Sequence, residues 1–142
     1  MTTTLPVEHV FRLHADTASI APILLSNGPQ GTRMIVTVSG GSFEGEQLKG
    51  TVAPCAGGDW LTIRDDGTFR LDVRVVLETH DGAAILMTYN GVGRRVDGRM
   101  VVHAAPTFET GDDRYQWLNG IQAVAIGETN ADGVTYEVYA LR

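Results

Sequence analysis

FRLDVRVVLETHDGAAILMTYNG, residues 69–91, is the stretch that decides the fold class. It holds two runs of strand length, residues 69–79 and 83–91, that are rich in valine, leucine and isoleucine. Asp81-Gly82 lies between them, and an Asp-Gly pair is a strong signal for a tight hairpin turn. In the first run apolar and polar residues alternate, which is the period of a half-buried strand. The stretch therefore predicts an antiparallel hairpin.

The same kind of turn signal recurs along the chain, which contains 17 glycines. Many of them follow Asp or Asn, as in Asn27-Gly28, Asp66-Gly67, Asp81-Gly82, Asn90-Gly91, Asp97-Gly98, Asn119-Gly120 and Asp132-Gly133. These dipeptides tolerate positive φ and favour turns. The runs between the turns predict strands near residues 6–14, 33–43, 46–53, 59–64, 69–79, 83–91, 99–105, 121–128 and 133–141. Residues 18–25 fit either a strand or a loop.

Connections this short force antiparallel pairing, because parallel strands need long crossovers. Eight or nine strands can close into a barrel, which removes exposed edges. We therefore expect an all-β fold: an antiparallel closed β-barrel of about eight to nine strands with a short helical turn near residues 112–118, in a single domain over residues 1–142. A two-sheet sandwich is the alternative that the pattern leaves open.

Two of the expected strands, 83–91 and 133–141, are apolar on both faces. An isolated barrel would show a cleaner alternation, so we expect part of the outer wall to be covered. A homo-oligomer would cover it, and a packed terminal segment would do so equally well.

The charge balance argues against two classes of partner. Seventeen acidic residues against eleven basic ones give a net charge of −6, and Arg94-Arg95 is the only adjacent basic pair. Nucleic acids and anionic membranes select clustered basic residues, so we expect neither as a partner. The apolar runs are too short to span a bilayer, and the N-terminal residues do not resemble a signal peptide. A single cysteine excludes an internal disulfide, which favours a cytoplasmic location.

Familiar cofactor and metal motifs are incomplete. Gly40 and Gly45 have the spacing of a phosphate loop, but Glu46 and Gln47 follow where lysine and serine or threonine are required. His9 and His14 are five residues apart, which predicts opposite faces of a strand. No histidine pair has the spacing of a metal site, so we expect no metal and no cofactor. Cys55 has no basic neighbour in sequence, so we interpret it as structural.

Acidic and aromatic residues at the ends of the expected strands form the candidate site. Asp72 and Arg74 share one face of strand 69–79, which is either a solvated outer face or the lining of a polar barrel interior. The segment that starts at Glu109 is either a cap over a barrel mouth or a hydrophobic plug. The candidate catalytic residues are Asp59, Glu109 and Arg74, and the candidate ligand-binding residues are Trp60, Asp72, Tyr89, Tyr115, Trp117 and Asn119.

Several short motifs in a fixed order resemble one family. They are Gly40-Gly41-Ser42-Phe43-Glu44-Gly45, Leu48-Lys49-Gly50, Gly58-Asp59-Trp60, Asp72-Val73-Arg74, Thr79-His80-Asp81-Gly82-Ala83, Phe108-Glu109-Thr110-Gly111 and Trp117-Leu118-Asn119. Together they resemble the uncharacterised bacterial family called domain of unknown function 3237, from about residue 5 to the end. The resemblance implies a compact antiparallel β-barrel, often oligomeric, with a central cavity. It implies no function.

Three functions remain open from the residues. The first is a cofactor-independent isomerase, cyclase or hydratase-lyase acting on a small apolar carbonyl or phenolic compound. In that case Asp59 or Glu109 would be the general base, and an oxyanion donor would come from Arg74, Tyr115 or Asn119. The second is a non-catalytic carrier or sensor of a small hydrophobic or aromatic molecule. The third is a partner-binding module whose interior is filled by side chains.

Overall fold

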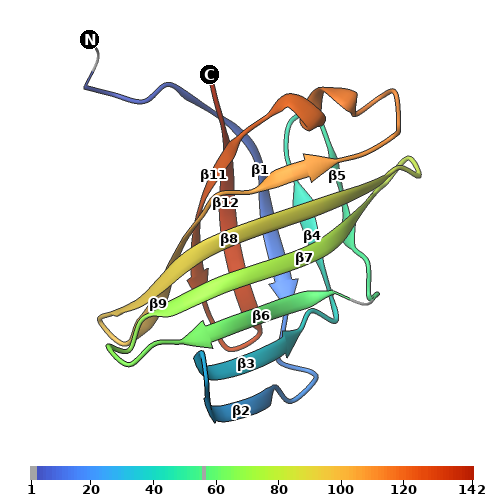
Figure 1. Ribbon diagram of the computed structural model, residues 1–142. Coiled ribbons are helices and arrows are strands. Elements are labelled where there is room, and N and C mark those ends of the chain that lie inside the picture. The colour runs from blue at the N-terminus through green and yellow to red at the C-terminus, as the bar shows by residue number, and fades with distance from the viewer. Residues whose placement is uncertain (1–2, 56) are drawn as a thin grey trace.

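The hairpin at residues 69–91 lies at the centre of the fold in the computed structural model, which describes residues 3–55 and 57–142 (Figure 1). Strand β7 (Phe69–Thr79) pairs antiparallel with β8 (Ala84–Val96). The prediction of this hairpin is confirmed. Strand β8 is longer than expected, because it continues through Asn90-Gly91, which the sequence pattern indicated as a turn.

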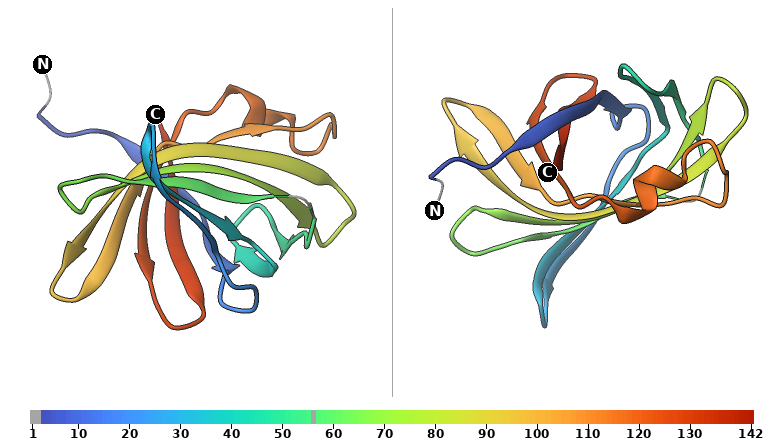
Figure 2. Two further views of the ribbon diagram at one scale, coloured as in Figure 1. Left: turned by 60° about the horizontal axis from the view of Figure 1, so that its bottom comes forward. Right: turned by 90° about the horizontal axis from the view of Figure 1, so that it is seen from above.

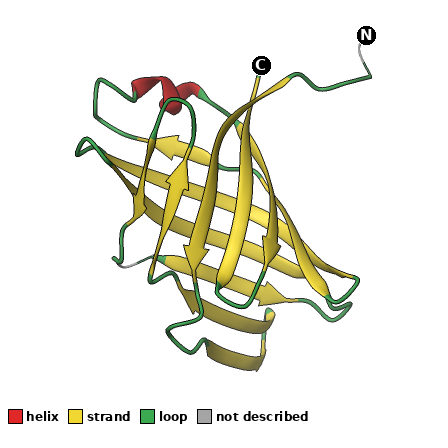
Figure 3. Ribbon diagram, turned by 180° about the vertical axis from the view of Figure 1, so that it is seen from behind, coloured by secondary structure: helices red, strands yellow, loops and turns green. Residues whose placement is uncertain are grey.

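Eight strands pair into a ring. The pairing starts at β8, passes through seven more strands and returns to β8 from β7, and every neighbouring pair is antiparallel. In ring order, the strands after β8 are β9 (Arg99–Ala104), β11 (Ala123–Thr129), β12 (Gly133–Leu141), β1 (Val7–Asp16), β4 (Gly40–Glu44), β5 (Lys49–Val52) and β7. The two walls of the ring are seen from the front in Figure 1 and from behind in Figure 3.

Four further strands extend this ring, so the described chain has twelve strands in one sheet instead of eight to nine. Strands β6 (Gly58–Ile63), β3 (Gly31–Thr37) and β2 (Ile23–Gly28) continue outward from one half of β7, and the hairpin of β2 and β3 projects from the ring (Figure 2). The short strand β10 (Thr107–Glu109) pairs with residues 86–88 of β8, on the edge of β8 that is opposite β7. A 3₁₀ helix, η1 (Gln116–Gly120), overlaps the predicted helical turn near 112–118.

The predicted single strand over residues 33–43 is wrong, because two strands occupy it. Strand β3 belongs to the outward extension, whereas β4 belongs to the ring and pairs with β1. Between them the Ser39 N–H donates to the carbonyl oxygen of Asp16 at 2.9 Å. This bond lies where the chain passes from the extension into the ring. The alternation of apolar and polar residues does not indicate this change of direction.

The prediction that His9 and His14 lie on opposite faces of a strand is also wrong. His9 contacts the Glu137 carboxylate at 3.1 Å, and His14 contacts the Thr135 hydroxyl at 2.8 Å. Both partners lie on the same face of β12. The pairing of β1 with β12 shifts register between His9 and Phe11, and a bulge of this kind exchanges the faces of the residues on either side.

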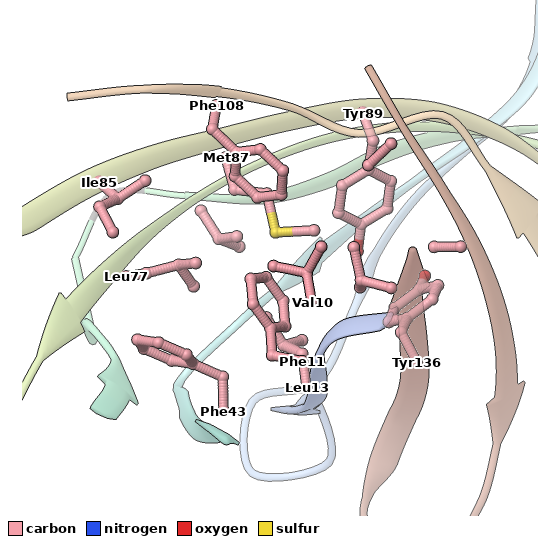
Figure 4. Close-up of a cluster of buried hydrophobic side chains, with 14 of the residues drawn as sticks. Val10, Phe11, Leu13, Phe43, Leu77, Ile85, Met87, Tyr89, Phe108 and Tyr136 are labelled. Carbon is pink, nitrogen blue, oxygen red and sulfur yellow. The ribbon is translucent and has the colours of Figure 1, made fainter. Parts of the chain in front are cut away.

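The interior of the ring is packed at one end. Phe11, Leu77, Ile85 and Met87 are at most 1% exposed there, and Phe108 packs edge-on against Phe11 with ring centroids 5.9 Å apart (Figure 4). Some outward residues of the ring are large, apolar and exposed: Leu86 and Val92 on β8, and Ile126 on β11. Of the two strands expected to be apolar on both faces, β12 has no exposed residue, whereas β8 has an exposed apolar side. The homo-oligomer that would cover it stays a prediction.

Within the described part of the chain, no helix is long and apolar enough to cross a membrane.

Candidate active site

A cavity of about 320 Å³ occupies the other end of the ring interior, where β6 and β3 leave the ring. This volume is at the lower end of the range for small-molecule pockets. Its wall is mostly apolar, with only a few polar groups. The lining residues that matter below are Asp59, Leu71, Tyr89, Arg95, Val102 and Tyr136.

Asp59, the second residue of strand β6, lines the cavity. The preceding Gly58 has a φ of +154°, and a Cβ at this position would lie 2.3 Å from the carbonyl oxygen of Val36. Glycine therefore allows β6 to approach β3 closely at this point. Across β7, Asp59 pairs with Val73, which in turn pairs with Tyr89, so the carboxylate and the phenol lie in one row across three strands.

The Asp59 carboxylate is half-buried, and this burial raises its pKa to about 6. One bond opposes the effect: the backbone N–H of Asp72 donates to Asp59 Oδ1 at 3.0 Å and favours the charged form. The negative charge of Asp72 adds a smaller contribution that raises the pKa. The result is a carboxyl group that can both donate and accept a proton near neutral pH.

Tyr89 and Tyr136 reach the cavity from different walls of the ring and meet edge to face, with ring centroids 5.4 Å apart (Figure 4). The interaction between their side chains raises the pKa of Tyr89 and lowers that of Tyr136. Burial is the larger influence and raises the pKa of both phenols, and the Asp59 charge raises both further. Both phenols therefore stay protonated and near the carboxylate.

Gly127 makes room for Tyr136. The two residues are paired between β11 and β12, and a Cβ on Gly127 would lie 2.4 Å from Cε1 and 2.5 Å from Cδ1 of the tyrosine ring. The ring thus lies directly over the glycine. A larger residue at position 127 would therefore require the tyrosine ring to shift.

Three of the sequence-predicted residues lie on the outer side of the sheet. In β7, Leu71, Val73 and Val75 are buried, whereas Asp72 and Arg74 between them are exposed. The polar face of this strand is therefore the solvated outer face and not the lining of a polar interior, the other alternative from the sequence. Trp60 follows Asp59 in β6, faces the other way and is 39% exposed.

The segment from Glu109 to Asn119 lies at the end of the ring away from β2 and β3 (Figure 1), and none of its residues lines the cavity. Leu118 is fully buried there, so the segment is a plug and not a cap over the cavity mouth. Glu109 and Trp117 are exposed. The side chain of Asn119 joins the two ends of the segment. It accepts a hydrogen bond from the Thr110 N–H and donates one to the Thr110 carbonyl oxygen, both at 2.9 Å.

Tyr115 is held within this plug by an acidic turn. Its hydroxyl donates to the Asp81 carboxylate, with oxygen distances of 2.9 and 2.8 Å. Hydrogen bonds from Thr79 and, to a smaller extent, Tyr115 lower the pKa of Asp81. The bond connects the plug to the β7–β8 turn and lies outside the cavity.

Of the nine candidate residues, the structure thus brings Asp59 and Tyr89 together in the cavity. Sequence reasoning missed Tyr136 and Arg95. Tyr136 shares the inward face of its strand with Val134 and Val138, so the sequence pattern indicates only an apolar face there. Cys55, which had been interpreted as structural, is free and exposed.

The fold and the cavity define a class of small, barrel-like, all-β proteins with an apolar pocket. The family described as "Protein of unknown function (DUF3237)" matches residues 5–141, and the chain belongs to this family. The resemblance seen in the sequence motifs is therefore confirmed.

Relatives of similar length share the fold. The UPF0311 protein RPA1785 from Rhodopseudomonas palustris is 32% identical, and the alignment covers 98% of both chains. Its crystal structure matches 99% of this chain and 100% of that chain with a TM-score of 0.89 at 28% identity. A β-barrel-like protein from Acinetobacter baumannii matches over 100% of both chains with a TM-score of 0.88 at 27% identity.

One relative carries the name of an enzyme. The hydroalkoxylation enzyme phnH from Penicillium herquei is 34% identical over 92 residues, which are 64% of this chain and 54% of that protein. The crystal structure of an enzyme from the same organism matches 100% of this chain and 98% of that chain with a TM-score of 0.77. At 24% identity this second match shows a likeness of fold.

Proposed function

We propose that the eight-strand ring is a closed barrel and that its cavity is the active site of a cofactor-independent enzyme. The enzyme would add a hydroxyl group across a carbon–carbon double bond, or reverse that addition, in a small apolar phenolic or carbonyl compound. The observation that carries the proposal is Asp59, a half-buried carboxylate with a pKa of about 6 in an otherwise apolar cavity. Perturbed carboxylates in clefts are typical of acid–base sites.

In the proposed reaction, protonated Asp59 donates its proton to one carbon of the double bond. The hydroxyl oxygen of the substrate forms a bond with the other carbon, and its proton returns to the Asp59 carboxylate. One C–H and one C–O bond form, while one O–H bond and the π bond break. Nothing is oxidised or reduced, so the reaction requires no electron carrier. A pKa near the working pH suits a group that acts first as an acid and then as a base.

The tyrosine pair has a supporting role in this proposal. The proposal takes Tyr89 as the donor to Tyr136, which leaves the proton of Tyr136 to bond an oxygen of the substrate. Its high pKa keeps that proton in place at neutral pH. Tyr136 would therefore orient the reacting hydroxyl group, and the apolar wall would bind the carbon skeleton.

The name of the Penicillium herquei relative supports the reaction class, because hydroalkoxylation is the addition of O–H across a double bond. The alternative function, a carrier or sensor, would use the same cavity without proton transfer. Asp59 distinguishes the two: a carrier has no need of its carboxylate.

The test is turnover of ortho-allyl and ortho-prenyl phenols, followed by chromatography and mass spectrometry. The expected product is a cyclic ether of unchanged mass, which gains one carbon-bound deuterium when the reaction runs in D₂O. D59N should lower the rate by about 100-fold or more, the usual contribution of general acid–base catalysis. D72N removes an exposed carboxylate nearby and should retain the rate.

Turnover that survives in D59N would contradict the proposal. Binding of these phenols to the wild type without any turnover would favour the carrier. A pH profile adds a second check, since the rate should fall as the pH rises through about 6 and Asp59 loses its proton.

A further inference from the structure

Arg95 places a positive charge at the cavity that the proposed reaction does not use. Along β8, alternate residues face the interior of the ring, and Met87, Tyr89 and Gly93 are buried on that face. Arg95 continues the same row six residues beyond Tyr89, toward the β8–β9 turn, and lines the cavity. Arg94, its neighbour, lies on the outward face and does not line it.

The guanidinium of Arg95 has no hydrogen bond or ion pair within residues 3–55 and 57–142. Some arginines of the chain are paired: Arg99 contacts the Glu128 carboxylate at 2.6 Å, and Arg114 contacts Asp112 at 2.8 Å. Others, such as Arg74 and Arg94, have no ion pair among the described residues either, but they do not line this cavity. Arg95 is also the one cation among the described residues that line this cavity. A cation without a partner at an apolar cavity is available for an anionic group of a ligand.

The cavity therefore has two chemically different ends. Asp59 lies in one strand row with Tyr89, whereas Arg95 lies farther along the same strand, near its end. Apolar residues such as Leu71 and Val102 line the space as well. A neutral hydrocarbon would leave the guanidinium unused, and a small dianion would be repelled by the carboxylate.

We propose that the substrate is an apolar organic acid whose anionic oxygen, a carboxylate or an acidic phenolate, pairs with Arg95 while its reacting carbon lies at Asp59. The proposal rests on the proposed function, since it names the substrate class of the same cavity. Arg95 then determines specificity and orientation, and Asp59 performs the proton transfer.

The test compares two ligands of the same shape, 2-naphthoate and the neutral 2-naphthamide, by isothermal titration calorimetry at pH 7.5 and low salt. The wild type should bind the naphthoate about threefold to tenfold more tightly, the range for a partly exposed charge-assisted pair. R95M should remove this preference and leave binding of the amide unchanged. R95K should retain part of this preference, because lysine keeps the positive charge but lacks the planar guanidinium with its paired N–H donors.

R94M is the matched control, since it removes the same charge from the adjacent position on the outward face. It should leave both affinities unchanged. Equal affinity of the wild type for the two ligands would overturn the inference, and so would an equal effect of R94M and R95M. If neither ligand binds, this inference fails, while turnover of the alkenyl phenols still decides the proposed function. If both ligands bind equally while D59N still abolishes turnover of the alkenyl phenols, only the role of Arg95 fails.

Discussion

Replacing Asp59 with asparagine should make the protein more stable at neutral pH. Burial raises the pKa of this carboxyl from the ordinary aspartate value of 3.8 to about 6, so between these pH values the folded chain holds a proton that the unfolded chain has released, and above them the folded chain carries a buried charge. At 1.36 kcal/mol per pH unit, the difference corresponds to at most about 3 kcal/mol of destabilisation at pH 7. Because Asp59 is only half-buried, solvent screening reduces the expected gain in D59N to about 1–2 kcal/mol.

The sign of the pH dependence follows from the same pKa. The contribution of Asp59 to folding stability is fully present below the unfolded value near 3.8 and is lost as the pH rises through about 6. Asparagine does not titrate, and its amide oxygen can still accept from the Asp72 N–H. The difference in unfolding free energy between D59N and the wild type should therefore be small at pH 4, grow between pH 4 and 6, and be constant above about pH 7.

Urea unfolding from pH 4 to pH 8 measures this difference directly. D72N serves as the control, because it removes an exposed carboxylate and should change stability by less than about 0.5 kcal/mol. If D59N is less stable than the wild type at pH 7, the reasoning is refuted. In that case the bond from the Asp72 N–H would outweigh the cost of burial, and Asp59 would be a structural residue.

Two further substitutions test the placement of the tyrosines. G127A should cost about 1–3 kcal/mol, the usual cost of overpacking, because its Cβ would overlap the Tyr136 ring, whereas G120A has open space around it and should have little effect; thermal unfolding measures both, and equal midpoints would contradict the close contact. Y115F should cost about 1 kcal/mol by removing the hydrogen bond to Asp81, and an unchanged unfolding midpoint would show that this bond does not stabilise the plug.

The hairpin of β7 and β8 could be predicted from sequence because its determinants are local. Alternating burial from Leu71 to Leu77 follows the alternating pattern of the residues, and the connection lies at Asp81-Gly82. Asn90-Gly91 carries the same signal but lies inside β8. There Gly91 pairs with Leu71 on one side and with Ala104 on the other, so contacts distant in sequence override the local turn preference.

The choice of face within each strand was harder to predict. From the sequence, the face of β7 that carries Asp72 and Arg74 could be either a solvated surface or the polar lining of a barrel. Only the way the sheet closes determines which face points to the solvent. Asp59 could be selected from its aromatic neighbour and its place at the start of a strand. Arg95 was noted only as half of a basic pair, since its alignment with Tyr89 requires β8 to continue past Gly91.

The position of Asp59 follows from a change of partner along one strand edge. Residues 77–79 of β7 pair with β5, which stays in the ring, whereas residues 69–74 pair with β6, which leaves it. Asp59 is the second residue of β6, so its carboxylate lies close to the point where the two strands part. A carboxylate deep inside the packed end of the ring would be held neutral by desolvation, and one on the outer face would have an ordinary pKa. Where β5 and β6 diverge, the Asp59 carboxylate is half-buried and has a pKa of about 6. A pKa in this range suits reversible proton transfer near neutral pH. The branching of the sheet, more than any single motif, therefore supports placing the proposed chemistry at this end of the fold.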